Sequence, residues 1–300
     1  MKKSIVSSFS VIVAMIVSAT AATTLENFEG YAPGNTLSLP LNGGTNWSGA
    51  WVTAGTTTAS GVVSNTTPLN GNNQYLDTDL TNTAAGAAMG IGRGLGDGAP
   101  TGNFTVSFQW RPDSLTGWGG SANDRFEFYS SASAATVNSA GAGGNATTSP
   151  YLLGVFGAAR GANYTAASAS GQLFGVYSAV NTNDAFSGDR YFELGSVATG
   201  GNGTTLAMVA GTTYTFTIEV FSGSQTWNVA VTDGVNTASS TGLKWWGTNT
   251  QPYIGFGARG SAGSETRSFS IDNVSVVPEP SSMALVALGG VTFLSRRRRR

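Results

Sequence analysis

Apolar residues at every second position dominate the middle of this chain. In FTVSFQW, Phe104, Val106, Phe108 and Trp110 alternate with polar residues, and the segments YTFTIEVF (214–221) and WNVAV (227–231) repeat the pattern. Successive side chains of a β-strand point to opposite faces, so a period of two gathers the apolar residues on one face. These segments predict strands that pack on one side.

Six further segments have the composition of strands, and turn-forming pairs separate them. The predicted strands are 125–129, 151–156, 172–177, 190–194, 252–258 and 268–277, and the turn pairs are Asn42-Gly43, Asn70-Gly71, Asp97-Gly98, Asn202-Gly203 and Asp233-Gly234. No helical stripe is found between residues 25 and 277. Many short strands joined by turns predict an all-β fold, a single antiparallel β-sandwich of the jelly-roll type.

The two ends of the chain differ from its middle. Residues 1–22 combine Lys2 and Lys3, an apolar run and the small-residue sequence Ala19-Thr20-Ala21, which predicts a secretory signal peptide; a permanent anchor is the alternative. The other end has a short apolar run, Met283 to Leu294, which predicts a helix of about 18 Å. That length is short for a hydrocarbon core of about 30 Å. The predicted organisation is therefore signal peptide 1–22, sandwich 23–277 and tail 278–300.

The composition excludes several classes of function. The chain has no cysteine and no histidine, which removes disulfides, zinc sites with His ligands and nucleophilic triads based on histidine. Between residues 23 and 278, eight Lys and Arg face fifteen Asp and Glu, a net charge of −7. An acidic domain without a basic stripe is not expected to bind nucleic acid.

Acidic pairs are the candidates for a glycosidase site, since hydrolysis of a sugar bond uses two carboxylates. Asp124 and Glu127 are three residues apart on a predicted strand and so point to opposite faces. Arg125 and Glu127 are expected on a solvated face, as are Asp77 and Asp79. The sequence therefore predicts a protein that is not an enzyme.

Two tryptophans are candidates for contacts with sugar, and one low-complexity segment predicts a loop. Trp118 lies in the glycine-rich sequence GWGG, and Trp246 follows Trp245, so that in a strand one of the two must point outward. Trp118 and Trp246 are the predicted sugar-contacting residues. Residues 130–150, rich in Ala, Ser, Thr and Gly, predict a long loop.

The alternation changes phase near the end of the predicted sandwich. In FSIDNVSVV, Phe269 and Ile271 set one phase and Val274 the other, which predicts a β-bulge at Asp272-Asn273. This sequence and LENFEGYAPG at the start resemble the last and first strands of concanavalin A-like and carbohydrate-binding β-sandwich domains. The resemblance implies one structural Ca²⁺ held by Glu29 and Asp272, with Glu26 as a further ligand. The alternative is that Asp272 accepts hydrogen bonds from turn amides.

The C-terminal tail carries a second resemblance. Val277-Pro278-Glu279-Pro280-Ser281-Ser282, the apolar run and the cluster Arg296, Arg297, Arg298, Arg299 and Arg300 are similar to the PEP-CTERM sorting tail. The resemblance implies that an exosortase-type membrane protease recognises Pro278, Glu279 and Pro280 and removes the apolar and basic parts. The precursor would then be held transiently at the inner membrane, with the arginines in the cytoplasm. An Arg-flanked membrane anchor is the alternative.

These features together favour an exported protein of the cell surface or extracellular matrix of a Gram-negative bacterium. The leading hypothesis is a structural or adhesive component associated with extracellular polysaccharide. A carbohydrate-binding module is the second hypothesis, and a polysaccharide hydrolase or lyase the third.

Overall fold

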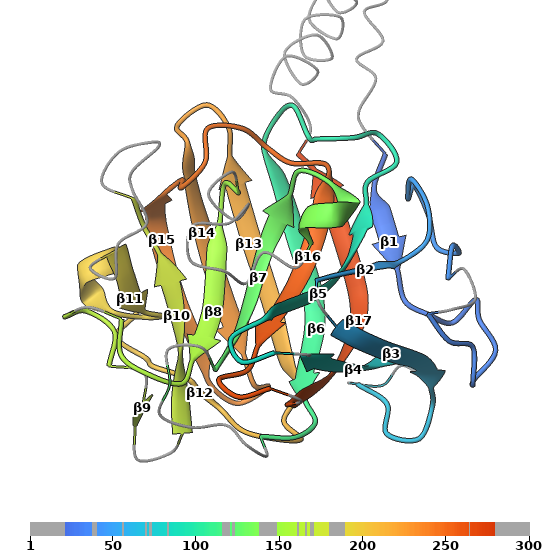
Figure 1. The fold of residues 1–300 in the computed structure, drawn as a ribbon. Coiled ribbons are helices and arrows are strands. Elements are labelled where there is room, and N and C mark those ends of the chain that lie inside the picture. The colour runs from blue at the N-terminus through green and yellow to red at the C-terminus, as the bar shows by residue number, and fades with distance from the viewer. Residues whose placement is uncertain are drawn as a thin grey trace, which may run out of the picture. The chain divides into compact units, whose positions relative to one another are not determined.

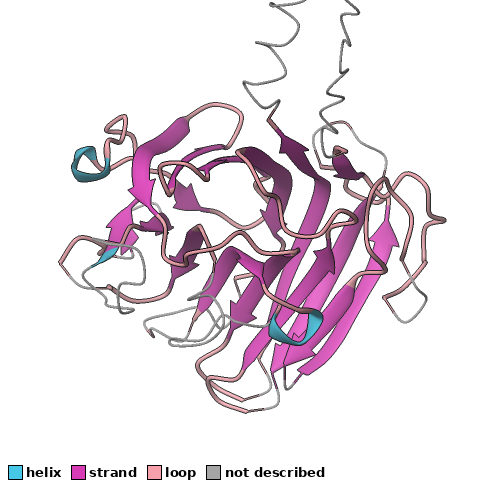
Figure 2. Ribbon diagram, turned by 90° about the horizontal axis from the view of Figure 1, so that it is seen from above, coloured by secondary structure: helices cyan, strands magenta, loops and turns pink. Residues whose placement is uncertain are grey.

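Two antiparallel β-sheets make up the described part of the chain (Figure 1). The computed structural model describes residues 22–279 except 38–40, 56, 70, 72–73, 83, 116–120, 122–123, 138–148, 161, 166, 169–170, 180–189 and 264. The helical residues described there are all of the short 3-10 type, as in Ala134–Thr136, Val197–Thr199 and Arg190 (Figure 2). The predicted all-β sandwich is confirmed, and each of the nine predicted strands overlaps an observed one.

The first sheet contains the strands with the clearest alternation. Its order is β15 (Thr237–Lys244), β14 (Thr226–Thr232), β13 (Tyr214–Phe221), β6 (Phe104–Pro112), β17 (Thr266–Pro278), β4 (Tyr75–Asn82) and β3 (Thr57–Ser64), and β1 (Thr24–Glu26) also pairs with β17. Along β13 the residues alternate strictly between buried and half-buried. One face of this sheet is therefore packed and the other is polar and partly open to water.

The second sheet lies against the first. Its order is β11 (Tyr191–Glu193), β10 (Gly171–Tyr177), β8 (Leu152–Phe156), β7 (Arg125–Ser131), β16 (Tyr253–Arg259), β5 (Ala88–Gly94) and β2 (Val52–Gly55), with β12 (Ala207–Met208) and β9 (Ala167–Ser168) paired to β10. The sequence did not predict β2, β3, β5 or β15. Their Gly-rich, Thr-rich and Ser-rich segments lack a run of large apolar residues at alternate positions.

The last strand, β17, lies inside its sheet between β6 and two successive neighbours. Its residues 266–271 pair with β4, and its residues 274–276 pair with β1. The predicted bulge is confirmed at the change of neighbour, because the register with β6 shifts between Asp272 and Ser275 and Asn273 has φ of 50°. The extra residue restores the inward direction of Val274, which is fully buried.

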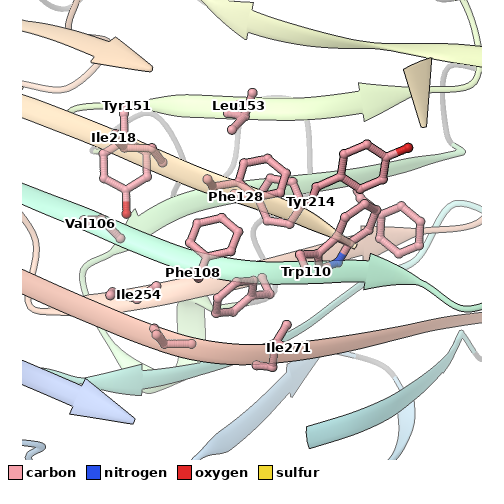
Figure 3. Close-up of a cluster of buried hydrophobic side chains, with 14 of the residues drawn as sticks. Val106, Phe108, Trp110, Phe128, Tyr151, Leu153, Tyr214, Ile218, Ile254 and Ile271 are labelled. Atoms are coloured by element: carbon pink, nitrogen blue, oxygen red, sulfur yellow. The ribbon is translucent and has the colours of Figure 1, made fainter. Parts of the chain in front are cut away.

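Aromatic rings fill the space between the sheets (Figure 3). Phe108 stacks on Phe216 with ring centroids 4.6 Å apart, and Trp110 meets Phe126 edge-on at 5.1 Å. Each fully buried aromatic side chain contributes on the order of 2–3 kcal/mol of hydrophobic free energy. This core replaces the disulfides that the chain cannot form.

The outer face of the second sheet is covered as well, which corrects one expectation. Arg125 and Glu127 point to this outer face as predicted, but they are only 2% and 3% exposed rather than solvated. A second aromatic cluster covers the face, and the ring of its Tyr164 lies close to the backbone of β10 at Gly175. A Cβ atom added to Gly175 would stand 2.6 Å from that ring, so the absence of a side chain permits the close approach.

The segment 130–150 is also more ordered at its ends than predicted. Ser130 and Ser131 belong to β7, and Val137 and Ser149 are fully buried. Ser149 Oγ accepts a hydrogen bond from the Ser130 N–H at 2.9 Å. Residues 138–148 lie outside the described residues. Within the described ranges, no helix has the length and apolar character needed to cross a bilayer.

Candidate functional site

The predicted sorting tripeptide begins inside the folded sandwich. Pro278 is the last residue of β17 and lies opposite Phe104 of β6. The next residue, Glu279, donates its N–H to the Asn103 carbonyl oxygen at 2.9 Å, and its carboxylate accepts a hydrogen bond from Asn103 Nδ2 at 3.2 Å. Pro280 and Arg296 to Arg300, the other predicted recognition residues, lie outside the described residues, as does the predicted helix 283–294.

Asn103 links this peptide to a neighbouring turn. Its Oδ1 accepts the N–H of Ser222 at 3.0 Å, in the turn between β13 and β14. Asn103 and Ser222 are half-buried, whereas Glu279 is exposed. Glu279 is therefore held at the surface by two hydrogen bonds to Asn103, one of its backbone N–H and one of its carboxylate.

The start of the predicted mature chain lies at the same end of the sandwich. The Ala22 N–H donates to Asp97 Oδ2 at 3.1 Å, and the Ala22 carbonyl oxygen accepts from Asn46 Nδ2 at 3.1 Å. A small cavity of about 80 Å³ is lined by both Ala22 and Pro278. The two predicted processing points thus lie beside each other, while residues 1–21 are outside the described residues.

The predicted calcium ligands are occupied in other ways. Glu26 is the counter-ion of Arg93, and both side chains are at most 1% exposed. The same carboxylate accepts hydrogen bonds from the Phe28 N–H and the Tyr31 hydroxyl. Tyr31 has a pKa raised to about 12, first by burial and then by the charge of Glu26. The Glu26 carboxylate thus already has a guanidinium group and two hydrogen-bond donors as partners, which does not fit the role of calcium ligand.

The other two predicted ligands do not complete a site. Glu29 is exposed and accepts the Gln74 N–H at 2.9 Å. Asp272 is fully buried and accepts the Asn273 N–H at 2.7 Å, which agrees with the alternative of bonding to a turn amide. Among the described residues, no three acidic side chains lie close enough to share a metal ion.

Trp246 does not have the exposed position that was expected of a sugar-contacting residue. Trp245 and Trp246 follow the end of β15 rather than continuing it, and both are only 2% exposed. Trp245 joins the core between the sheets, whereas Trp246 packs on Tyr177 with ring centroids 4.7 Å apart. Trp246 therefore has no face to offer a sugar. Trp118 lies outside the described residues, so its role stays a prediction.

The acidic residues near β7 are held by arginines. Glu127 is 3.4 Å from Arg125, and burial raises the pKa of Glu127 although the guanidinium groups of Arg125, Arg160 and Arg259 oppose that shift. Asp124, fully buried, pairs instead with Arg267 at 2.6 Å. The two carboxylates thus have separate partners, which does not support a glycosidase pair.

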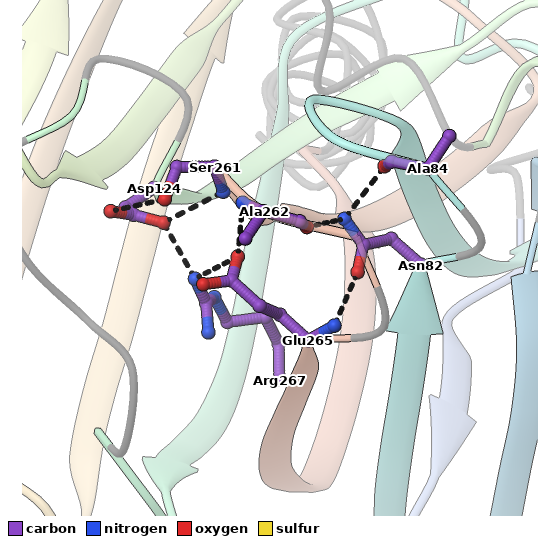
Figure 4. Close-up of polar contacts among 7 residues, drawn as sticks. All are labelled: Asn82, Ala84, Asp124, Ser261, Ala262, Glu265 and Arg267. Atoms are coloured by element: carbon purple, nitrogen blue, oxygen red, sulfur yellow. Dashed lines mark hydrogen bonds and ion pairs between the residues drawn. The ribbon is translucent and has the colours of Figure 1, made fainter.

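Asp124 is the centre of a polar network that the sequence did not indicate (Figure 4). Its carboxylate also accepts the Ser261 N–H at 3.0 Å, and Glu265 accepts from Arg267 at 3.2 Å. Asn82, at the end of β4, donates to the Ala262 carbonyl oxygen and accepts the Glu265 N–H at 2.7 Å. The network joins the start of β7 and the β16–β17 turn to the end of β4.

Hollows larger than the cavity beside Ala22 and Pro278 also open on the surface of the described part of the chain. One of about 290 Å³ is lined by Leu37, Val62, Asp77 and Asp79 among others. As predicted, Asp79 is exposed, but Asp77 is half-buried. Burial, and then the charges of Asp113 and Asp79, raise the pKa of Asp77.

The second hollow, of about 450 Å³, lies near the tail end and is uncharged. Its walls are Ala99, Pro100, Thr101, Ser222, Gln225, Trp245, Thr248, Asn249 and Thr250. Hydroxyl and amide groups therefore dominate the polar part of its surface. Gln225 has φ of 50°, which is unusual for a residue with a side chain.

Comparison with solved structures gives similarity at low sequence identity. A sialidase matches with a TM-score of 0.46 and 11% identity, over 86% of this chain and 18% of that one. Peanut lectin with a 9-residue peptide matches with a TM-score of 0.41 and 16% identity, over 87% of this chain and 100% of the lectin. The exoplasmic/lumenal domain of VIP36, in its Ca²⁺/Man3GlcNAc-bound form, matches at 0.42 and 12%, over 77% and 83%.

These values are too low to transfer a ligand or an activity to this chain. The chain also spans less than a fifth of the length of the sialidase. Comparison with curated protein sequences gives no match. Comparison with protein-family models gives a match at the C-terminus, described as the PEP-CTERM protein-sorting motif. Residues 276–300, which begin inside the last strand of the sandwich, carry a PEP-CTERM protein-sorting motif.

Proposed function

We propose that this protein is exported and delivered to the cell surface or extracellular matrix of a Gram-negative bacterium through processing of its C-terminal tail. The observation that carries the proposal is the sorting motif at residues 276–300. An exosortase-type membrane protease recognises Pro278, Glu279 and Pro280 and releases the sandwich. The sandwich then acts as a structural or adhesive component rather than as an enzyme.

The physical character of the two ends supports this route. The signal peptide directs export, and the five terminal arginines resist translocation, so the precursor is held with its sandwich outside and its last residues in the cytoplasm. The apolar run of twelve residues reaches about 18 Å as a helix, against a hydrocarbon core of about 30 Å. A short span of this kind suits a temporary association with the membrane.

Replacement of Pro278, Glu279 and Pro280 by alanine in the full-length chain tests the proposal. We expect an unprocessed precursor in the membrane fraction, detected by its mass and by immunoblotting. The matched control replaces the adjacent Ser281 and Ser282 by alanine and leaves processing unchanged. Normal processing of the tripeptide variant would overturn the proposal.

Carbohydrate binding is a second candidate function, and the uncharged hollow near the tail end favours it. Hydroxyl and amide groups around a hollow of about 450 Å³ match the many hydroxyl groups of a neutral polysaccharide. Pull-down with extracellular polysaccharides, with reaction products monitored in parallel, tests this function. We expect binding without products and weaker binding by Asn249→Ala.

Two further variants separate the possible contacts with sugar. Trp118→Ala tests the remaining predicted tryptophan, and Asp79→Asn, in the other hollow, serves as the control. Polysaccharide binding that is equal in Asn249→Ala and the unaltered chain rejects the uncharged hollow as the site. Release of sugar products rejects the non-enzymatic assignment.

A further inference from the structure

The last strand extends into the sorting motif without a linker. β17 is thirteen residues long, and its final residues Val277 and Pro278 lie opposite Thr105 and Phe104 of β6. Glu279 continues the ladder with its bond to the Asn103 carbonyl oxygen. Of the recognition tripeptide, Pro278 is therefore part of the folded sheet, and Glu279 is hydrogen-bonded directly beyond the end of the strand.

Pro278 fits this strand because of the direction of its nitrogen. Successive N–H groups of a strand point to opposite sides, and the Glu279 N–H points to β6. The Pro278 nitrogen therefore points away from β6, to the edge where the pairing of β1 has ended at Thr24 opposite Val276. A proline is tolerated on such an edge because no ladder hydrogen bond is lost.

Residues Pro278 and Glu279, as held on the sandwich, have few free hydrogen-bonding groups for a protease to bind. Proteins that bind an extended peptide commonly pair with its backbone. Here Asn103 accepts the Glu279 N–H and donates to one oxygen of the Glu279 carboxylate. On the open edge, Pro278 has no backbone N–H to donate to a protease. Recognition of the tripeptide therefore requires that Glu279 first leave Asn103.

We propose that Asn103 is a clamp that holds Glu279 of the sorting tripeptide on the folded sandwich, and that release of Glu279 from Asn103 precedes processing. This inference rests on the proposed function, and it adds a control step to the same site. When a partner binds only the released form, its apparent affinity falls by the fraction released. A weaker clamp then gives faster processing.

Asn103→Asp in the full-length chain tests the clamp. The variant keeps an oxygen that accepts the Ser222 N–H, but it removes the donor to Glu279 and places a carboxylate opposite that residue. Loss of one hydrogen bond raises the released fraction, and with it the processing rate, by about three- to tenfold. Pulse labelling followed by immunoprecipitation measures the conversion of precursor to mature protein.

Ser275→Ala is the matched control on the same pair of strands. It removes the hydrogen bond between the Ser107 and Ser275 hydroxyls, 2.8 Å long, and leaves the contacts of Glu279 in place. We expect it to be processed at the unaltered rate. A rate for Asn103→Asp equal to or below that of the unaltered chain overturns the clamp.

A second measurement does not depend on processing. In the purified full-length chain, the Glu279 amide should exchange its hydrogen faster in Asn103→Asp, whereas the amides of residues 266–276 keep their protection. Unchanged exchange at Glu279 also rejects the clamp. If the alanine tripeptide variant is processed normally, the proposed function and the clamp fail together; if only Asn103→Asp behaves as the unaltered chain, the clamp alone fails.

Discussion

The two ends of β17 are held in different ways. At its start, Arg267 forms an ion pair with Asp124 at 2.6 Å, and both side chains are at most 1% exposed. At its end, Glu279 is exposed and is held by two hydrogen bonds to Asn103. Removing one partner of a buried ion pair costs about 3–5 kcal/mol, whereas a typical hydrogen bond contributes about 0.5–1.5 kcal/mol net. The strong contact is at the start of β17, and the weak one is at its end, where the sorting motif continues beyond the strand.

The largest expected effect is from Asp124→Asn. The change removes the charge of the closer carboxylate beside the buried Arg267 guanidinium, and Glu265 remains 3.2 Å away. We expect a loss of about 3 kcal/mol in the free energy of unfolding. For a domain of this size, that corresponds to a melting temperature lower by roughly 6–12 °C. Thermal unfolding of the purified full-length chain, followed by circular dichroism, measures the change.

Asp79→Asn is the control for that experiment. Asp79 is exposed and accepts one hydrogen bond from the Ser268 hydroxyl, so its replacement should change stability by no more than about 0.5 kcal/mol. The comparison also needs Asn103→Asp to lose much less stability than Asp124→Asn, because it removes one hydrogen bond and not a buried ion pair. A loss at Asn103 as large as that at Asp124 would show that the two ends of β17 are held equally well.

The contrast between the ends could not be predicted from the sequence, because its contacts are long-range. Asp124 and Arg267 are 143 positions apart, and Asn103 and Glu279 are 176 apart. The bulge at Asp272-Asn273 was predictable because a change of phase is visible within a few residues. The position of the tripeptide was also readable, but not its pairing with β6.

Burial of the two sheets was also predictable only where it depends on neighbouring residues in the sequence. The first sheet has one half-buried polar face, so the alternation in its sequence corresponds directly to the two faces of β13. The second sheet is covered on its outer face by residues from distant loops, among them Tyr164 and Trp246. The sequence of the segment RFEFY (125–129) does not predict that its outer face is buried by these loops. Arg125 and Glu127 were therefore expected in water, and Trp246 on the surface.

A smaller effect is expected from Asp77→Asn, beside the first half of β17. Burial raises the pKa of Asp77, so its ionised form is less stable in the folded protein than in the unfolded chain. The folded state then binds more protons than the unfolded state, and stability falls as the pH rises from about 4, the ordinary Asp value, through the raised folded pKa. Asp77→Asn removes this loss, and we expect a melting temperature higher by about 1–2 °C at pH 7.

The pH dependence is the check on that cause. Below pH 4 the carboxyl group is protonated in both states, so the variant and the unaltered chain should melt at the same temperature. A gain that persists unchanged at pH 3 would show that the charge of Asp77 is not responsible. The ionised carboxylate of Asp77 would then not lower the free energy of unfolding. The comparison of Asp77 with Asp124, which has an arginine partner, would no longer hold.

The smallest expected effect is that of calcium, and it bears directly on the difference between the ends. A calcium ion between the terminal strands would stabilise the tail end with a charged contact stronger than the Asn103 clamp. Glu26 instead pairs with Arg93, which also donates to the carbonyl oxygens of Gly49 and Gly43 at 2.7 Å, so β1 is tied to β5 without a metal. We expect neither calcium nor EDTA to change the melting temperature of the full-length chain. A rise with calcium that Asp272→Ala abolishes would mean that Glu29 and Asp272 bind the ion, and that processing releases a tail from a firmly held end rather than from a weak one.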